Sequence, residues 1–527
     1  MSFFGKATTK RLVAVHGWSG TVLGLILYVV VLTGSIAVFA TEITEWTSGS
    51  SFSHTAFDQP VHDTLVTLAD DIDPAYMDDI AIFSRTGGLL QVLFHTHEKS
   101  ENGTLRDKGT RFLLDARNLE IQDRQDGYLD EMPSGQDGLL TSFIVRLHIN
   151  LHAPNPWGMW MTGVLGFVML IASISGIFLH RHMIRDLFVA PRWSSVLLNR
   201  RDRHILAGSW TLPFGFLLAF TGMFFSFAGT LAVPVVAVVA FGGDQEKLLE
   251  LATGVPVQVD PRPGQRANVD EILAHARRVA GSAPGSVSIQ HWGRKDARIT
   301  VAHAAPETGL LGSRHIFDGA TGAYLGEKPA IGPKPSTGSD VIGLMGPLHF
   351  GHFGGLLSKI IWLSLGLATS YITLTGLQLW VERRSDQPGW AWLGPTVITV
   401  GYGTGIGLAA SGAAFFLSLP SQQADFWTPA GFLIGSALSI LIGMALRRNG
   451  ALERSLAGVL AALLIALPIL RMVMGHGGWA THFAQGHAAV IGIDLTLCAA
   501  GALIAWWAFI RQQFGPLAQR NVQMPAE

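Results

Sequence analysis

Four of the chain's 19 histidines occupy matching positions in an internal repeat. His16 is followed by a glycine after four residues and by a Thr-Gly pair after 17, and His204 is followed by the same residues at the same distances. His148 and His349 begin a second pair of matching stretches, each of which later contains a Ser-Gly or Thr-Gly pair. Two imidazoles that face each other across a helix bundle supply the axial ligands that a haem iron needs. The repeat therefore predicts two haem-binding pairs, His16 with His204 and His148 with His349.

The spacing of the repeat places these pairs at opposite depths of a membrane. A helix rises about 1.5 Å per residue, so the stretch from His16 to the Thr-Gly pair covers about 26 Å, most of a hydrocarbon core. We expect His16 and His204 at the cytoplasmic ends of equivalent helices, and His148 and His349 at the outer ends of the other two. A pseudo-twofold axis along the membrane normal would bring the members of each pair face to face. Two haems, one near each leaflet, would let electrons cross the membrane.

The cysteine content restricts the kind of cofactor. The only cysteine, Cys498, lies in an apolar stretch. Intrachain disulfides, cysteine-ligated iron–sulfur clusters and covalent c-type haem, which needs a C-x-x-C-H motif, are therefore excluded. The haems are expected to be non-covalent haem b.

Three further histidines leave the exact ligand set open. His152 follows His148 by one helical turn, and His352 follows His349 by three residues. His180 lies at the end of the second predicted span. Each of the three could be the true ligand, an additional ligand or a hydrogen-bonding partner of a haem propionate.

Two basic residues and a histidine-rich loop are also candidates. Arg146 and Lys359 lie close to the outer histidines, where they either bind haem propionates or extend to the membrane interface. His476, His482 and His487 lie in one predicted loop. That loop either binds a metal or is a hydrated segment at the interface.

The composition places these residues in a polytopic membrane protein. Hydrophobic residues make up 49% of the 527 residues and charged residues 14%, whereas a soluble domain has about 25% charged residues. The net charge of −1 creates no overall field that would attract nucleic acid. Eight segments are long and apolar enough to span a bilayer. They are residues 12–41, 147–179, 205–243, 343–381, 389–424, 426–446, 455–473 and 487–510.

Charge bias predicts the orientation. The short connection 181–203 has six arginines and two acidic residues, and the other connections on its side are also basic, which favours the cytoplasm for that side and for both termini. The first span follows several basic residues but is too long for a signal peptide and lacks its cleavage site, so we expect an uncleaved anchor. Residues 41–140, with 19 acidic and 7 basic residues, and residues 244–340, with 11 of each, are then periplasmic. Each has the pattern of a small α+β module, with one helix, two strands and a hairpin.

Two charged residues within the later spans predict a specific contact. Arg471 and Asp494 lie near the outer ends of neighbouring spans, and we expect them to form an ion pair rather than a proton pathway. The motif GYGTGIG at residues 401–407 lies inside a span and predicts close helix packing rather than a nucleotide-binding loop.

At the histidine-bearing stretches the sequence resembles the PepSY-associated transmembrane helix proteins, which include iron-regulated inner-membrane reductases of ferric siderophores. The resemblance covers roughly residues 8–385, and FDGATGAYLGE resembles the closing hairpin of a PepSY domain. The later spans resemble an extension of longer family members. The matching stretches are RLVAVHGWSGTVLG, RLHINLH, SGIFLHRHMIRDLF, PLHFGHFGG and TGLQLWVERR.

The resemblance implies b-type haem in the helix bundle, with His16, His148, His204 and His349 as ligands. It also implies electron delivery to a ferric chelate in the periplasm of a bacterium. Because no nicotinamide or flavin domain is visible, the donor would be quinol or a cytoplasmic reductase. The alternatives are a sensor or regulator whose outer modules bind a peptide or protease, and a transporter that uses the last spans.

The expected fold is an α-helical polytopic membrane protein with about eight spans. A core of four helices, two from each copy of the repeat, would bind the haems. Two small periplasmic α+β PepSY-like modules would be inserted between these helices in the sequence. The expected divisions are the first span (1–41), the first module (42–139), the second and third spans (140–243), the second module (244–340), the fourth span (341–385) and four additional spans (386–527).

Overall fold

The structure is a computed structural model, and the chain forms two compact units within it. The first, called here the helical unit, comprises Met1–Gly49, Gln136–Phe227 and Ile360–Glu527. The second, called the sheet unit, comprises Ser50–Gly135 and Ala228–Lys359. The residues that the structure describes are 5–51, 57–99, 105–129, 131–132, 136–180, 184–188, 190–192, 195–244, 247–248, 252, 259–305, 309–332, 334–446, 449–474 and 477–510.

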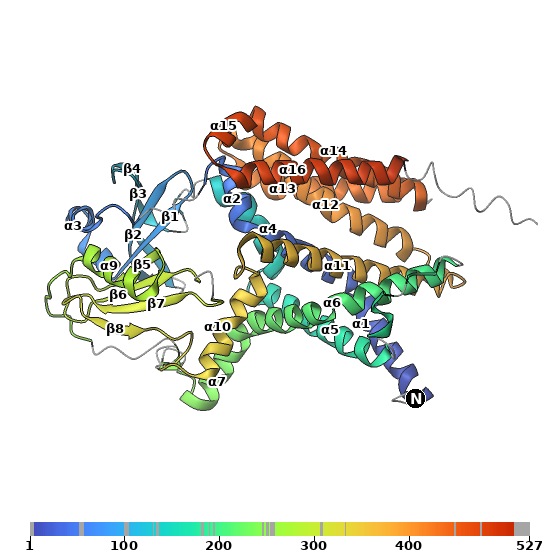
Figure 1. The fold of residues 1–527 in the computed structure, drawn as a ribbon, viewed down its shortest axis with the longest axis horizontal. Coiled ribbons are helices and arrows are strands. Elements are labelled where there is room, and N and C mark those ends of the chain that lie inside the picture. Colours follow the sequence, from blue (N-terminus) through green and yellow to red (C-terminus); the bar gives the residue numbers. More distant parts are fainter. Residues whose placement is uncertain are drawn as a thin grey trace, which may run out of the picture. The chain divides into compact units, whose positions relative to one another are not determined.

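Eight helical segments of the described chain are long and apolar enough to cross a membrane, which confirms the eight predicted spans (Figure 1). Each contains an 18-residue window with at most two charged residues, so its side chains suit a hydrocarbon environment while the helix satisfies its own backbone. The spanning elements are α1 (Lys6–Ala37), α5 (Trp157–Leu179), α6 (Val196–Phe227) continuing into α7 (Val233–Phe241), α11 (Gly355–Glu382), α12 (Leu393–Ser418), α13 (Ala424–Ala445), α14 (Asn449–Val473) and α16 (Ala488–Ala505).

The second spanning helix begins later than expected. His148 lies on a separate shorter helix, α4 (Leu139–Asn150), which ends where Leu151 and His152 adopt left-handed backbone with φ of 54° and 55°. Prolines at positions 154 and 156 have no N–H to continue a helix. The prediction of one continuous helix over residues 147–179 is therefore wrong at its start.

The fourth spanning helix has the same kind of break in the second repeat. His349 lies in the last turn of α10 (Thr337–Phe350), which ends at Gly351 with φ of 69°. A second left-handed glycine, Gly355 with φ of 55°, begins α11. Glycine adopts this backbone without the steric cost that other residues have. Each histidine thus precedes its spanning helix instead of belonging to it.

Small residues let α12 and α13 approach closely, as the glycine motif predicts. A Cβ atom on Gly403 would lie 3.0 Å from Cβ of Ser439, and one on Gly407 would lie 2.8 Å from the hydroxyl of Ser436. Side chains at these positions would push the two helices apart. The motif is therefore a packing surface, in keeping with small-residue contacts between membrane helices.

The predicted ion pair between Arg471 on α14 and Asp494 on α16 is confirmed. Nη2 of Arg471 lies 2.6 Å from Oδ2 of Asp494, and both side chains are fully buried. The indole nitrogens of Trp46 and Trp479 donate to the two carboxylate oxygens at 2.7 and 2.9 Å. His482 is 2.8 Å from Nη1 of Arg471, so it belongs to this network. His476, its neighbour in the histidine-rich loop, lies outside the described residues.

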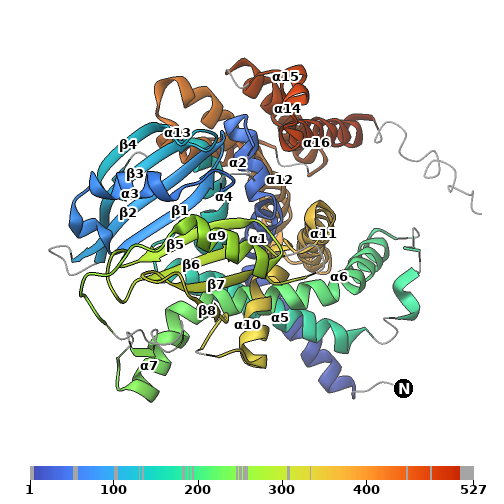
Figure 2. The same ribbon diagram turned by 60° about the vertical axis from the view of Figure 1, so that its left-hand side comes forward.

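The sheet unit contains one antiparallel sheet with the strand order β4-β3-β2-β1-β5-β6-β7-β8 (Figure 2). The first four strands come from the first predicted module and the last four from the second. The helix and strand pattern expected for each half is present, but the halves join where β1 pairs with β5. The strands are β1 (Asp79–Arg85), β2 (Leu89–Lys99), β3 (Leu105–Asp115), β4 (Ile121–Tyr128), β5 (Pro284–Gln290), β6 (Arg298–His303), β7 (Ser313–Asp318) and β8 (Tyr324–Glu327).

The two halves of the sheet also share one hydrophobic core. Helices α3 (His62–Asp70) and α9 (Val269–Ala280) cover the same face, and their buried side chains form one cluster with the inward side chains of both halves. The carboxylate of Asp270 accepts hydrogen bonds from the backbone N–H groups of Val61 and His62 at the start of α3. The two expected modules are thus halves of a single folded unit, because neither half completes the sheet or the core alone.

Candidate functional site

The structure brings His16 of α1 and His204 of α6 together inside the helical unit. The centroids of the two rings are 6.3 Å apart, and the ring planes are inclined by 78°. Bonds of about 2 Å from two imidazoles to opposite sides of one metal ion place the bonded nitrogens about 4 Å apart. The ring centroids lie behind those nitrogens, so the observed separation would allow both imidazoles to bind one iron.

The partners of His16 determine which ring nitrogen carries its proton. Nδ1 is 3.1 Å from the carbonyl oxygen of Ala172 and 3.0 Å from the hydroxyl of Ser175, both on α5. A carbonyl oxygen can only accept a hydrogen bond, so Nδ1–H of His16 is the donor. The lone pair of the neutral ring is then on Nε2.

His204 has the same arrangement with a different helix. Its Nδ1 is 3.2 Å from the hydroxyl of Thr375 on α11. That hydroxyl donates to the carbonyl oxygen of Tyr371 at 2.9 Å, so it accepts from Nδ1–H of His204. Metal-binding histidines almost always use their second nitrogen in this way, which fixes the tautomer and the ring orientation.

The glycines that follow these hydroxyl residues make room for the imidazoles. A Cβ atom on Gly376 would lie 3.2 Å from Cε1 of His204, and one on Gly176 would lie 3.8 Å from Cε1 of His16. The Ser-Gly and Thr-Gly pairs were visible in the repeat. Their role was not predicted, because only the fold shows that each pair supports the histidine of a neighbouring helix.

A cavity of about 1310 Å³ opens beside the two histidines and is lined by α1, α5, α6 and α11. It is larger than the roughly 300–1,000 Å³ of most small-molecule pockets. Gly20 and Gly208, each one turn after its histidine, line it. Apart from each glycine's chain neighbours and the nearby backbone of its own helix, no heavy atom of the described residues lies within 4 Å of where a Cβ on either glycine would be. A large flat ring could therefore approach both helices closely.

The charge of the cavity lining suits an anionic group. Basic residues outnumber acidic ones there by five to one, and the single acidic residue, Asp202, pairs with Arg192. Haem carries two propionate carboxylates, which arginine and lysine bind well. The residues present therefore fit a b-type haem. The other basic lining residues are Lys10, Arg201, Arg383 and Arg384.

His148 is held in the same manner as His16. Its Nδ1 is 2.8 Å from the carbonyl oxygen of Val30 on α1, so Nδ1–H donates and the lone pair is on Nε2. A Cβ atom on Gly34 would lie 2.5 Å from Cε1 of His148, so only glycine fits there. His148 therefore resembles His16 and His204 in having one ring nitrogen fixed by a neighbouring element.

The prediction that His152 lies one helical turn after His148 is wrong. His152 lies beyond the end of α4, where its left-handed backbone directs the ring toward Phe143 of that helix. Nε2 of His152 is 2.9 Å from the carbonyl oxygen of Phe143, and its ring stacks on that phenyl ring at 4.6 Å. This interaction closes the turn after α4.

The remaining candidates divide between the two units. His180 follows the last residue of α5, as predicted, and lines the same cavity as His16. Arg146 is exposed on α4, two residues before His148. His349, His352 and Lys359 belong to the sheet unit, with His352 just beyond the C-terminal end of α10.

A family model described as "PepSY-associated TM region" matches residues 13–383. The chain belongs to this family. The matched PepSY-associated TM region contains the four repeat histidines and the whole sheet unit, whereas α12 to α16 lie beyond it. A similar protein is the uncharacterized protein PA4219 of Pseudomonas aeruginosa, which is 28% identical over 380 residues, covering 69% of this chain and 93% of the relative.

Proposed function

We propose that this protein is a dihaem b electron-transfer protein that reduces ferric siderophores or other Fe(III) chelates in the periplasm of a bacterium. Electrons would come from quinol or a cytoplasmic reductase. In this proposal the chain lies in the inner membrane with both termini in the cytoplasm. The observation that carries it is the facing pair of His16 and His204, in which Nδ1–H of each ring donates a hydrogen bond to a neighbouring helix.

The chain's own residues have a defined task in such a protein. Haem, when bound, supplies one-electron redox chemistry at its iron. His16 and His204 would bind it through Nε2, while the hydroxyls of Ser175 and Thr375 fix the ring orientations. His148 and His349 are proposed as the ligands of the second haem. Reduction of Fe(III) to Fe(II) needs one electron and no acid–base group, so no further catalytic residue is proposed.

Charge favours some chelates over others. Residues 41–140, most of which lie in the sheet unit, carry 12 more acidic than basic residues. The resulting negative potential attracts cationic ligands, has little effect on neutral ones and repels polyanions. We therefore expect the protein to prefer neutral or cationic ferric chelates over ferric citrate.

Stopped-flow mixing of the dithionite-reduced protein with ferric chelates, without oxygen, tests the proposed function. Reoxidation of the haem, followed through its absorption bands, should be faster with a cationic or neutral hydroxamate than with ferric citrate at low salt. The difference should shrink at about 1 M salt, where the screening length is about 3 Å. If no ferric chelate reoxidises the protein faster than buffer does, the reductase proposal fails. A colourless, folded protein would instead favour a sensor or regulator.

A conservative change beside the histidine tests the proposed haem site separately. Thr375→Val keeps the shape of the side chain but removes the hydroxyl acceptor of His204 and leaves, among the described residues, only its hydrogen bond to the backbone of Ile372. Loss of a hydrogen bond to a metal-binding side chain typically weakens metal binding by about 10- to 100-fold, and haem titration should show a loss of this size. Thr404→Val is the matched control, because Thr404 is a buried threonine of α12 that bonds only within its helix in the described structure. Equal affinities for the two variants would contradict the role of Thr375.

A further inference from the structure

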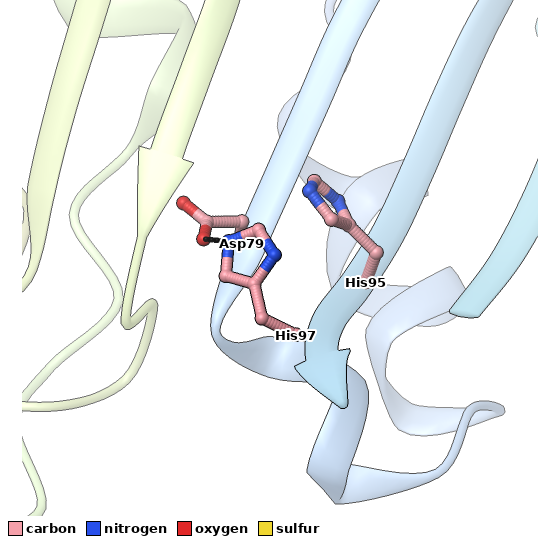
Figure 3. A group of neighbouring side chains, drawn as sticks. All are labelled: Asp79, His95 and His97. Carbon is pink, nitrogen blue, oxygen red and sulfur yellow. Dashed lines mark ion pairs between the residues drawn. The ribbon is translucent and has the colours of Figure 1, made fainter. Parts of the chain in front are cut away.

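Three side chains of the sheet unit form a cluster that the electron-transfer proposal does not use. Asp79 lies on β1, and His95 and His97 lie on β2 (Figure 3). One ligand atom from each residue lies within 4.8 Å of the other two. The bonds of a transition-metal ion to nitrogen and oxygen are about 2.0–2.2 Å long, so small side-chain rotations would bring all three onto one ion.

The strand register explains why these residues meet. Residues two apart on a strand point to the same face, which places His95 and His97 together. Asp79 is directly opposite His95 in the β1–β2 pair, and Asp107 is directly opposite His97 in the β2–β3 pair. Phe94, the residue before His95, points into the core on the face that α3 and α9 cover. The two histidines and two aspartates therefore lie on the other face of the sheet.

The hydrogen bonds of His97 leave a nitrogen directed at the cluster. Its Nδ1 is 2.6 Å from Oδ1 of Asp107, and its Nε2 is 3.4 Å from Oδ2 of Asp79. A carboxylate behind a histidine is the usual outer support of a metal-binding imidazole. Asp107 thus holds His97 with Nε2 toward Asp79.

His95 adds a second, independent observation. Its Nδ1 is buried, and no hydrogen bond among the described residues reaches that atom. Buried ring nitrogens normally have a partner. The residue opposite His95 on β3 is Gly109, where a Cβ atom would lie 1.9 Å from the carbonyl oxygen of Phe94, so this position offers the ring no side-chain partner. The ring of His95 lies 5.6 Å from that of His97, measured between centroids.

We propose that Asp79, His95 and His97 form a binding site for a divalent first-row transition-metal ion. Two imidazoles and one carboxylate are ligands for Fe²⁺, Co²⁺ or Zn²⁺, whereas Ca²⁺ and Mg²⁺ prefer oxygen ligands alone. Three protein ligands leave positions open for water or an exchanging ligand. If the chain reduces ferric chelates, the ion produced is Fe²⁺. That identification of the natural ion rests on the proposed function, but the binding site does not.

The competing explanation is a structural ion pair. The hydrogen bond to Asp107 raises the pKa of His97, so a protonated His97 could simply link Asp79 and Asp107 across three strands. That explanation assigns no task to His95. Metal content, measured in variants of His95 and Asp79, therefore distinguishes the two.

Equilibrium dialysis of the full-length, detergent-purified protein against Zn²⁺, followed by elemental analysis, tests the site. Zinc reports on the cluster, and iron in the same sample reports separately on haem. His95→Gln and Asp79→Asn should each lose about one zinc per chain, and Asp107→Asn should bind zinc about 10- to 100-fold more weakly. Iron content should not change in any of these variants.

His291→Gln is the control, because His291 also lies beside a carboxylate, that of Asp296 at 3.7 Å, but outside the cluster. It should retain the zinc content of the unmodified protein. Thermal unfolding in the absence of metal confirms that each variant is folded. If His95→Gln and Asp79→Asn bind as much zinc as the unmodified protein, the ion-pair explanation is correct and the metal site is overturned. If the unmodified protein binds zinc at this site but has no ferric-chelate reductase activity, only the proposed function is contradicted.

Discussion

Replacing His204 with alanine is expected to reduce the haem content from about two to about one per chain. His204 would supply one of two axial ligands in its cavity, and its removal leaves His16 without an opposing imidazole. His16→Ala should have the same effect, because the two rings face each other at 6.3 Å. His349→Ala should instead remove the other haem. The pyridine haemochrome assay measures the content, and the absorption spectrum identifies the remaining haem.

Imidazole rescue makes this test more specific. In His204→Gly the cavity beside α6 is enlarged by one imidazole, so free imidazole should restore the six-coordinate spectrum. His487→Ala controls for the general loss of a histidine, since His487 contacts His482 in a different part of the helical unit. Loss of both haems from a folded His204→Ala protein, or of neither, would show that the histidines are paired wrongly.

Breaking the buried ion pair is expected to cause the largest loss of stability. Asp494→Ala leaves the guanidinium of Arg471 buried without its counter-charge and also removes the acceptor of two indole N–H groups. Removing one partner of a buried pair costs about 3–5 kcal/mol. Denaturant unfolding of the detergent-solubilised protein, followed by tryptophan fluorescence, should show a loss of this size.

A double variant distinguishes the cost of an unpaired buried charge from the cost of lost side-chain packing. Asp494→Leu combined with Arg471→Met removes both charges, so its loss should be smaller than that of Asp494→Ala. Arg192→Ala breaks an ion pair whose arginine side chain is 55% exposed, and it should cost at most about 1 kcal/mol. If Asp494→Ala were no more destabilising than Arg192→Ala, the buried ion pair and its hydrogen bonds would not contribute to stability as expected.

The sequence predicts the spans well because a single physical rule governs them. Burying a charged side chain in hydrocarbon is energetically costly, so long uncharged stretches such as those of α1 and α5 can be recognised as spans from the sequence. The same rule makes the exceptions informative, and it correctly predicts the pairing of Arg471 with Asp494. The breaks before α5 and α11 depend on local backbone geometry at a few residues. Hydrophobicity does not report that geometry.

The candidate site could be predicted only in part. The repeat identifies His16 and His204 as equivalent and places them at equal depth. It does not show that Ser175 and Thr375 hold them, because each lies on a helix far away in the sequence. The cluster of Asp79, His95 and His97 was missed for a related reason. A His-x-His pair on a strand is visible in the sequence, but the opposing aspartate depends on the strand register.

The shared sheet has a consequence for biosynthesis. β1 pairs with β5, and about 200 residues separate them, including two membrane spans. At roughly 5–20 residues per second, a ribosome needs about 10 to 40 s for that interval. Throughout it, β1 presents an unpaired edge next to the apolar Ile80 and Ile82, which is the kind of edge that joins other chains. We therefore expect the first half of the sheet to depend on a chaperone during synthesis, until the second half is made.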